Sequence, residues 1–357
     1  MDIEDKIKIV NSIAQEVITE DELRELFETN DHPVAYDGFE PSGLAPMHFG
    51  VYRAKTIKKL MKTGIKFNAY IADYFAFINN KIGGDIDRIK DVGRYFIEVW
   101  KASGLDVNII WSSDLMKDPS YWDRFLKIGR SVSLDRAHRA ITIMGRKEGD
   151  KLDTAQLFYP IMQVTDIFQM DVDICQLGID QRKANILARE TAKKFGWKVP
   201  VAVHHPYLLG LKGAPSNLLQ MSEEEGMQYK MSKSNPKNSI FIHDTYDEIK
   251  KKINSAYCPE RIIDGNPIFN YLDKIVIDDK DEPLSIDRPE KFGGIIEVEN
   301  YKELVKYYEE GKIHPVDIKE FTTEKLEELI KPIREHFEKN KEAKELYEKV
   351  KSYQITR

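Results

Sequence analysis

Apolar residues gather along this chain in short runs that alternate with longer amphipathic stretches. Several runs are apolar almost throughout, which is typical of strands covered on both faces. The strand candidates are residues 33–39, 65–72, 107–113, 172–178 and 199–205. The helical patterns between them span 49–63, 86–103, 119–147, 153–170 and 180–196. This order predicts an α/β fold with a doubly wound, Rossmann-like parallel sheet, whose ligands bind beyond the carboxyl ends of the strands.

The pattern differs at the two ends of the chain. Thr19 and Glu22 have the spacing of a capping box and predict a short helix ahead of the first strand. Beyond residue 243, charge-rich helical segments dominate around one turn-rich stretch at 278–294. We therefore expect a catalytic-type α/β domain over 1–243 and a mostly helical domain over 244–357.

Composition narrows the class of protein. Hydrophobic content of 41% and charged content of 32% are typical of a soluble globular chain. The N-terminus has no signal-peptide core, and no apolar run approaches the roughly 20 residues of a membrane span. Cys175 and Cys258 are the only cysteines, too few for a disulfide framework or a zinc site, so we expect a cytoplasmic protein. The net charge of -6 argues mildly against bulk attraction to nucleic acid but leaves local basic patches open.

A cationic run follows the last predicted strand. Lys230, Met231, Ser232, Lys233 and Ser234 spell KMSKS in a long loop that also contains glycines. Two lysines on a mobile arm suit the negative charge of a departing pyrophosphate. The alternative is a solvated loop, which would be the better interpretation for any random pair of lysines.

A second run follows the first predicted strand. His48, Phe49, Gly50 and Val51 stand where the next helix begins. A glycine there lets a flat base approach the backbone, and the helix end plus an imidazole can hold phosphate oxygens. Taken alone, such a histidine is more often a capping or surface residue, and only its pairing with KMSKS reverses that interpretation.

These two runs resemble the HIGH and KMSKS signatures of class I aminoacyl-tRNA synthetases. Val51 departs from the pattern, since the family has its second histidine there, and this moves phosphate stabilisation onto His48, Lys230 and Lys233. The resemblance implies catalytic roles for His48, Gly50, Lys230 and Lys233. The ATP-binding residues that it implies are Gly38, His48, Gly50, Lys230, Met231, Ser232, Lys233 and Ser234.

The helix predicted at 153–170 carries a polar stripe on an otherwise apolar surface. Tyr159, Gln163 and Asp166 recur at i, i+4 and i+7 and therefore share one face. A buried carboxylate without partners is costly, so this stripe must line something polar. A structural hydrogen-bond network is the alternative.

The segments YPIMQVTD (159–166), QLGIDQRK (176–183) and GFEPSG (38–43) resemble the archaeal and eukaryotic tyrosyl-tRNA synthetases. The resemblance implies that Tyr36 and Asp166 bind a phenol oxygen. It also implies that Tyr159, Gln163 and Gln181 hold the α-amino group. A site that pairs a hydroxyl rejects the substrate lacking it, and tyrosyl-tRNA synthetases are themselves a well-known case of this rule.

Basic and aromatic residues form a third group of candidate functional residues. Arginines and a histidine cluster along 130–146, where they could grip an acceptor stem. The resemblance assigns Arg139, Arg182 and Lys183 to the first base pair of a tRNA. The alternative for each is an ordinary surface charge.

The C-terminal half holds two further matches, KFGG (291–294) and HPVDIK (314–319). By resemblance, Phe292 stacks on the first anticodon base, and His314 and Asp317 hydrogen-bond it. Stacking plus edge contacts is how proteins usually read loop bases. The alternatives are a core role for Phe292 and a helix cap made by His314 with Asp317.

The resemblance as a whole implies a tyrosine–tRNA ligase. Its substrates would be L-tyrosine, ATP carried with Mg²⁺, and tRNA(Tyr), with no tightly bound cofactor. Relatives pair as homodimers through the region that corresponds to about 107–147 here. Three alternatives stay open: a tryptophanyl-tRNA synthetase, a free-standing nucleotidyltransferase, and a non-catalytic RNA-binding paralogue.

Overall fold

The computed structural model describes residues 1–145, 151–233, 235–277 and 283–353. Its centre is a six-stranded sheet in the order β1-β6-β5-β2-β3-β4. Strand β1 runs antiparallel to β6, and the other neighbours are parallel, which confirms the predicted α/β sheet. The strands are β1 (Glu16–Ile18), β2 (Val34–Phe39), β3 (Lys66–Ile71), β4 (Asn108–Trp111), β5 (Ile174–Cys175) and β6 (Val201–His204).

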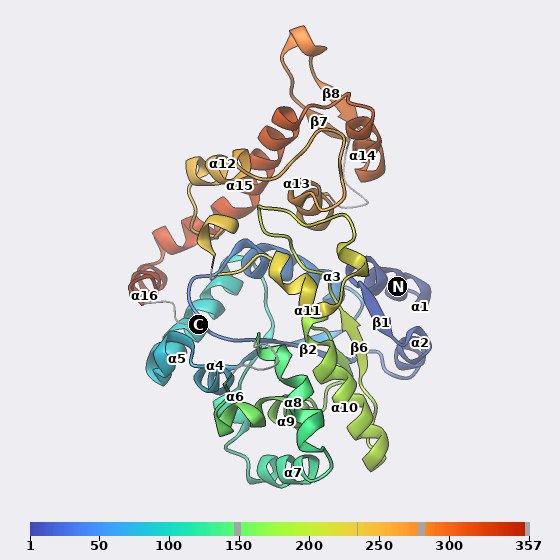
Figure 1. Ribbon diagram of the computed structural model, residues 1–357, viewed down its shortest axis with the longest axis vertical. Helices are drawn as coiled ribbons and strands as arrows, with labels where there is room; N and C mark the ends of the chain where they lie inside the picture. Colours follow the sequence, from blue (N-terminus) through green and yellow to red (C-terminus); the bar gives the residue numbers. More distant parts are fainter. Residues whose placement is uncertain (146–150, 234, 278–282, 354–357) are drawn as a thin grey trace.

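Helices pack on both faces of this sheet (Figure 1). Successive strand residues point to opposite faces, and they join two separate hydrophobic clusters. Ala35 of β2 belongs to the larger cluster with helices α3 and α5, whereas Tyr36 belongs to the smaller one with α7, α9 and α10. The helices of this half are α1 (Ile3–Ile13), α2 (Glu20–Thr29), η1 (His48–Arg53), α3 (Ala54–Met61), α4 (Asp73–Ile78), η2 (Lys81–Gly84), α5 (Ile86–Ala102), α6 (Ser112–Leu115), α7 (Pro119–Gly129), α8 (Leu134–Ala140), η3 (Ile141–Met144), α9 (Thr154–Gln169), η4 (Ile179–Gln181), α10 (Arg182–Phe195), η5 (Leu218–Gln220), α11 (Glu223–Gly226), η6 (Met227–Tyr229) and η7 (Pro236–Asn238).

The structure departs from the predicted elements in several places. The pattern at 119–147 is broken into α7, α8 and η3, because Ser133 leaves the helical conformation and caps α8 by accepting from the Arg136 N–H. The predicted strand at 172–178 contributes only the two residues of β5. Strand β1 was not predicted. The capping box at Thr19 and Glu22 is confirmed at the start of α2.

The remaining residues form a mainly helical region above the sheet in Figure 1. A two-stranded antiparallel sheet, β7 with β8, interrupts it: β7 lies within the stretch 278–294 where the sequence predicted turns, and β8 follows shortly after that stretch. No helix among the described residues is long and apolar enough to cross a membrane. The elements are α12 (Tyr246–Asn254), α13 (Pro267–Tyr271), η8 (Leu272–Val276), β7 (Leu284–Ile286), η9 (Glu290–Phe292), β8 (Ile296–Val298), α14 (Tyr301–Glu309), α15 (Pro315–Lys339) and α16 (Lys341–Lys351).

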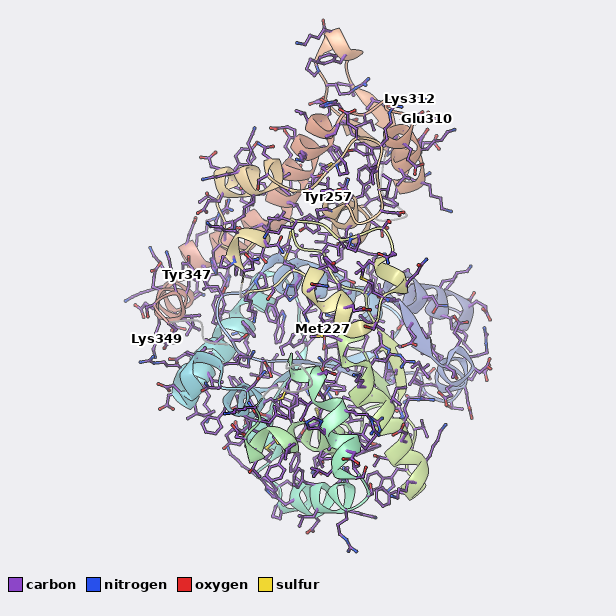
Figure 2. All side chains as sticks on the ribbon, viewed as in Figure 1. Met227, Tyr257, Glu310, Lys312, Tyr347 and Lys349 are labelled. Atoms are coloured by element: carbon purple, nitrogen blue, oxygen red, sulfur yellow. The ribbon has the colours of Figure 1, made fainter. Side chains whose placement is uncertain are left out.

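The C-terminal helices are tied firmly to the first half of the chain. Figure 2 shows Tyr347 and Lys349 on α16, which lies beside α5. The Tyr347 ring stacks on His243 with 3.8 Å between centroids, and the Lys349 ammonium lies 2.6 Å from the Asp91 carboxylate. The larger hydrophobic cluster also runs without a break across residue 243, so the domain boundary there stays a prediction.

A buried arginine holds the η1 segment against the sheet. Arg53 is 2% exposed and donates from Nε to Asp37 Oδ2 of β2 over 3.0 Å. Its other nitrogens donate to Thr56 Oγ1 at 2.8 Å and to Gln176 Oε1 at 2.5 Å. One guanidinium therefore joins β2, the residue after β5, and the segment that begins at His48.

Replacing Arg53 by leucine should lower the free energy of unfolding by about 3–5 kcal/mol, because the Asp37 carboxylate would stay buried without its partner. Urea denaturation measures this change. Arg94→Leu is the matched control, since that exposed guanidinium also contacts a carboxylate, Asp91, and its loss should cost less than about 1 kcal/mol. Equal losses in the two variants would contradict a central role for Arg53.

Candidate active site

The polar face of α9 meets the carboxyl end of β2. Asp166 is 1% exposed and accepts a hydrogen bond from Tyr121 Oη over 2.9 Å. Its other oxygen, Oδ2, is buried and has no hydrogen-bond partner among the described residues, and the same holds for the buried hydroxyls of Tyr36 and Tyr70. Burial raises the pKa of Asp166 to about 8. Buried oxygens that are left unpaired at one place mark a site that is completed by a polar group from outside.

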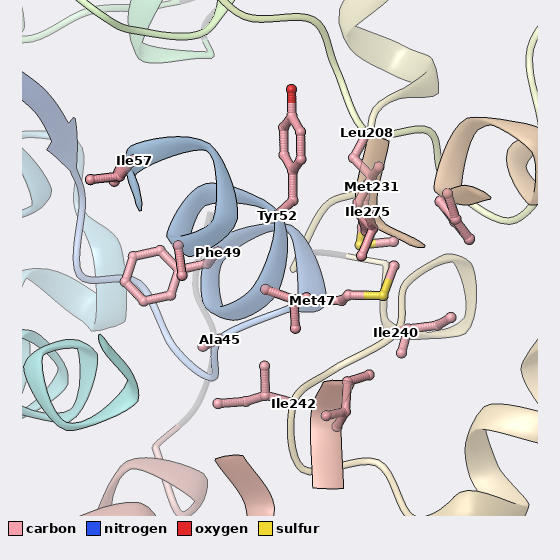
Figure 3. Packing of buried hydrophobic residues seen from close by; sticks show 14 of the residues in the cluster. Ala45, Met47, Phe49, Tyr52, Ile57, Leu208, Met231, Ile240, Ile242 and Ile275 are labelled. Atoms are coloured by element: carbon pink, nitrogen blue, oxygen red, sulfur yellow. The ribbon is translucent and has the colours of Figure 1, made fainter. Parts of the chain in front are cut away.

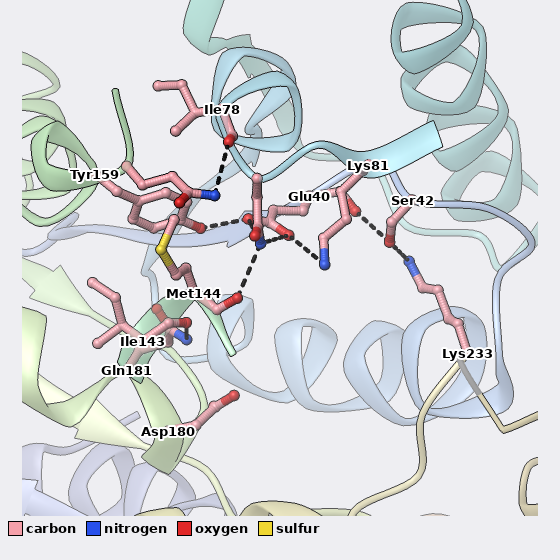
Figure 4. Close-up of polar contacts among 12 residues, drawn as sticks. Glu40, Ser42, Ile78, Lys81, Ile143, Met144, Tyr159, Asp180, Gln181 and Lys233 are labelled. Carbon is pink, nitrogen blue, oxygen red and sulfur yellow. Dashed lines mark hydrogen bonds and ion pairs between the residues drawn. The ribbon is translucent and has the colours of Figure 1, made fainter. Parts of the chain in front are cut away.

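The other end of the stripe also has polar neighbours (Figure 4). Tyr159 Oη donates to Glu40 Oε1 over 2.7 Å. Gln163 Nε2 donates to Gln181 Oε1 over 3.3 Å, and Gln181 Nε2 donates to the Ile143 carbonyl over 2.9 Å. The structure thus brings all five predicted tyrosine-site residues to one region, with a hydroxyl-rich end at Asp166 and an amide-rich end at Gln181.

Sequence reasoning missed three residues of this site. Tyr70 had a usable signal, because the β2–β3 register pairs Tyr36 with Asn68, and Tyr70 is two residues further along the same face. Tyr121 and Glu40 had none, since their contacts to Asp166 and Tyr159 join segments 45 and 119 residues apart.

His48 lies at the start of the η1 segment, which is a π-helix. Its Nδ1 is buried and makes no hydrogen bond with the part of the chain that the structure describes. Burial, with the charges of Lys233 and Lys230 as smaller causes, lowers the pKa of His48 to about 3. The imidazole is therefore neutral at physiological pH. Val51, at the departing position of the signature, packs into the larger hydrophobic cluster.

The two signature lysines face the same region as His48. Lys230 Nζ donates to Asp180 Oδ2 over 2.5 Å. Lys233 Nζ donates to Ser42 Oγ over 3.0 Å and lies 4.4 Å from the centre of the Phe96 ring. Burial, with the Lys81 charge as the second cause, lowers the pKa of Lys233 to about 7.

Met231 is 2% exposed and packs with Met47, Leu208 and Ile275 in the larger cluster (Figure 3). Its backbone N–H donates to the Leu208 carbonyl over 2.7 Å. The methionine therefore anchors the KMSKS loop, and its contact with ATP stays a prediction. Ser232 N–H donates to Ser239 Oγ over 3.1 Å, while Ser234 lies outside the described residues.

Gly50 has a packing reason to be a glycine. A Cβ there would lie 2.6 Å from Ile242 Cγ2 and 3.1 Å from Val99 Cγ1. The space beside Gly50 is thus filled by the protein itself, and the approach of a flat base stays a prediction. At Gly38 a Cβ would make only an ordinary contact, 3.6 Å from Tyr70 Cδ1.

The predicted RNA-binding residues lie on α8 and at the start of α10, directly after Gln181. Arg139 is exposed on α8, and Arg182 Nε donates to both carboxylate oxygens of Glu16 at 3.1 and 2.9 Å. Lys183 follows at the start of α10.

The anticodon candidates lie in the C-terminal half. Phe292 is 62% exposed, so the core alternative is wrong. His314 and Asp317 do form a helix cap: His314 Nδ1 accepts from the Val316 N–H over 3.2 Å, and the His314 N–H donates to Asp317 Oδ2 over 3.3 Å. A cap does not prevent either side chain from contacting a base, so their role stays a prediction.

Comparisons with known proteins agree with this site. A family model described as tRNA synthetases class I (W and Y) matches residues 28–331. The chain is 43% identical over 349 residues to tyrosine–tRNA ligase of Sulfurisphaera tokodaii, which covers 96% of this chain and 95% of the relative. It is 40% identical over 362 residues to the cytoplasmic tyrosine–tRNA ligase 1 of Arabidopsis thaliana, covering 100% of this chain and 90% of the relative. It also superposes on the crystal structure of tyrosyl-tRNA synthetase complexed with L-tyrosine from Pyrococcus horikoshii, with a TM-score of 0.89, 38% identity, and coverage of 98% of this chain and 100% of that chain.

The chain belongs to the class I tyrosyl-tRNA synthetases. It is of the archaeal and eukaryotic type, at about 40% identity over its full length. This synthetase is a tyrosine–tRNA ligase of protein biosynthesis, with tyrosine, ATP and tRNA(Tyr) as substrates. The tryptophanyl, nucleotidyltransferase and non-catalytic alternatives are therefore set aside.

The packing explanation for Gly50 can be tested separately from catalysis. Gly50→Ala should lower the free energy of unfolding by about 1–3 kcal/mol, because the added methyl group overlaps Ile242. In an Ile242→Ala background the same substitution should cost clearly less, as a double-mutant cycle in urea would show. An unchanged cost would mean that the contact with Ile242 does not explain the glycine.

Proposed function

We propose that this synthetase activates tyrosine by positioning and charge stabilisation, without a covalent enzyme intermediate. The tyrosine carboxylate attacks the α-phosphate of ATP in line, which gives tyrosyl-adenylate and pyrophosphate. A ribose hydroxyl of the terminal tRNA adenosine then attacks the activated carbonyl. ATP enters as its magnesium complex.

The substrate phenol binds between Tyr36 and Asp166. The observation that carries this proposal is a pair of buried oxygens at the end of the pocket, Tyr36 Oη and Asp166 Oδ2, which find no hydrogen-bond partner within the described residues. A phenol hydroxyl can donate one hydrogen bond and accept another, so it can pair with both. Phenylalanine would leave them unpaired.

The α-amino group binds at the opposite end, against Tyr159, Gln163 and Gln181. These three side chains come from two segments, α9 and η4, whose polar groups already contact one another. An ammonium group donates three hydrogen bonds and accepts none, so it needs oxygens from its partners.

The triphosphate binds beside His48, with the two lysines as its cationic partners. Lys230 is paired with Asp180 in the free protein, so it is already held near the pocket. A lysine whose pKa is about 7 gains its full charge when a polyanion arrives, which suits Lys233 to the departing pyrophosphate. His48, being neutral, can accept or donate one hydrogen bond without adding charge. The remaining nucleotide contacts are assigned to Gly38, Gly50, Met231, Ser232 and Ser234.

The tRNA binds along one side of the molecule, with Arg139, Arg182 and Lys183 at the first base pair. Its anticodon reaches Phe292, His314 and Asp317. The exposed ring of Phe292, with the Lys291 ammonium 4.9 Å from its centroid, supports a stacking role, because the bases of single-stranded RNA loops stack on aromatic side chains. Arg182 must exchange its contact with Glu16 for the RNA.

The partner across the region 107–147 is a second copy of the chain. Trp122, Leu126 and Phe158 are 48%, 62% and 45% exposed, and they lie on the adjacent helices α7 and α9. The ring of Phe125 connects this surface, with centroids 5.8 Å from Trp122 and 5.7 Å from Phe158. An exposed apolar surface of this kind marks a protein interface. Residues 146 and 147 of the predicted region lie outside the described residues.

We also propose a cytoplasmic location. The Arabidopsis thaliana relative carries that location in its name. Cys175 and Cys258 are free thiols, as expected in a reducing compartment.

Two variants separate recognition from chemistry. Lys230→Ala should slow tyrosine-dependent ATP–pyrophosphate exchange by about 10²–10³-fold while the Kd for tyrosine stays within a factor of two, because the lysine acts on the departing group.

Asp166→Ala should instead reduce the preference for tyrosine over phenylalanine, measured as a ratio of kcat/KM, by about 10–100-fold. Equal losses of exchange rate and tyrosine affinity in Lys230→Ala, or unchanged selectivity in Asp166→Ala, would contradict these roles.

The interface has its own test. Leu126→Asp should convert the dimer to a monomer in sedimentation velocity experiments, because a charge would be buried against the second copy. Ile262→Asp, which changes a similarly exposed apolar residue in the C-terminal half, should leave the dimer intact. A wild-type chain that sediments as a monomer would refute the interface.

A further inference from the structure

Two consecutive backbone carbonyls in η3 govern the direction of hydrogen bonds at the amino-group end of the pocket. The Ile143 carbonyl accepts from Gln181 Nε2 over 2.9 Å, and the Met144 carbonyl accepts from Asn79 Nδ2 over 2.9 Å. A carbonyl oxygen can only accept, so each side-chain amide must turn its NH₂ group toward η3. The orientation of both side-chain amides is therefore fixed, and so are the atoms that each amide offers to its other neighbours.

The orientation of the Asn79 amide determines the hydrogen bonds that it makes with Glu40. Asn79 is 1% exposed, and its Nδ2 also donates to the two Glu40 oxygens at 3.1 and 3.2 Å. Lys81 Nζ lies 3.7 Å from Glu40 Oε2 (Figure 4). Glu40 is therefore surrounded by donors and serves as an acceptor.

Tyr159 is the last member of this series. Its hydroxyl donates to Glu40 Oε1 over 2.7 Å. Burial, with the Glu40 charge second, raises the pKa of Tyr159 well above its usual value, so the phenol keeps the proton that it donates. Because that proton points to Glu40, the lone pairs of the phenol oxygen are left for another donor.

The Gln181 amide gives the same result by a second route. With Nε2 turned to the Ile143 carbonyl, Gln181 Oε1 faces the other way, where Gln163 Nε2 donates to it. Both routes begin at η3 and end in an oxygen that accepts.

We propose that Glu40 is a positioning residue for tyrosine, which acts through Tyr159 by fixing the Tyr159 hydroxyl as an acceptor for the substrate α-ammonium group. This rests on the proposed function, in which Tyr159 contacts that ammonium. An O–H turned toward an ammonium group would repel it, so the direction of one hydrogen bond decides whether the site binds its substrate.

Glu40→Gln is the informative change because it keeps the shape of the side chain. Asn79 would still donate to the new amide oxygen, which leaves the new NH₂ group facing Tyr159. The Tyr159 hydroxyl would then accept a hydrogen bond from that NH₂ group and point its own proton into the site. The KM for tyrosine in ATP–pyrophosphate exchange should rise about 10–100-fold, while the KM for ATP stays within about twofold.

Two competitive inhibitors separate this effect from general damage. Tyramine carries the phenol and the ammonium group, whereas 4-ethylphenol carries the phenol alone. In Glu40→Gln the Ki of tyramine should rise about 10–100-fold and that of 4-ethylphenol should change less than about twofold. A parallel loss of both inhibitors would overturn the proposal. Asp114→Asn, which removes an exposed carboxylate paired with Lys117, is the control for net charge and should change neither.

A double variant tests whether Glu40 acts through Tyr159. In a Tyr159→Phe background, Glu40→Gln should have no further effect on tyramine, because there is no hydroxyl to turn. An undiminished effect would show direct attraction between Glu40 and the ammonium group and would overturn the proposal. Tyr159→Phe alone tests the proposed function: if it leaves both Ki values unchanged, the assignment of Tyr159 to the amino group fails. If it weakens tyramine while Glu40→Gln does not, only the inference about Glu40 fails.

Discussion

The buried guanidinium of Arg53 is the interaction on which the arrangement of the active site depends. It lies between Asp37 of β2 and Gln176 after β5, and it extends from the segment that starts at His48. Removing a charge from water costs several kcal/mol, which only well-placed partners offset. The geometry that satisfies Arg53 is therefore also the geometry that places the first signature at the carboxyl edge of the sheet.

Burial then shapes the chemistry of each end of the pocket. It raises the pKa of Asp166 and lowers the pKa of His48 and Lys233, in each case because the charged form loses its hydration. The free protein thus holds several groups close to neutrality. A substrate hydroxyl or phosphate group supplies the partner that these side chains lack. Substrate binding and the change of these side chains to the suitable charge state therefore occur together.

Much of the sheet and the polar stripe of α9 could be predicted, because continuous apolar runs and an i, i+4, i+7 pattern are local properties of the sequence. Strand β1 could not, since its three half-buried residues carry no such pattern and depend on pairing with β6. Tyr121 and Glu40 were missed for a related reason: their roles arise from contacts between distant segments. The sequence alone explained Gly50 only by ATP binding, because its packing neighbour Ile242 is far away in the sequence.

The short pairing between the two signatures has a mechanical consequence. The Met47 N–H donates to the Ile240 carbonyl over 2.7 Å, and the Ile242 N–H donates to the Ala45 carbonyl over 3.2 Å. These bonds lie just before His48 and just after the KMSKS loop, and the side chain of Ile242 fills the space beside Gly50. Residues 240–242 therefore couple the two signatures mechanically, because a shift of either segment at this point must carry the other with it or break these two hydrogen bonds.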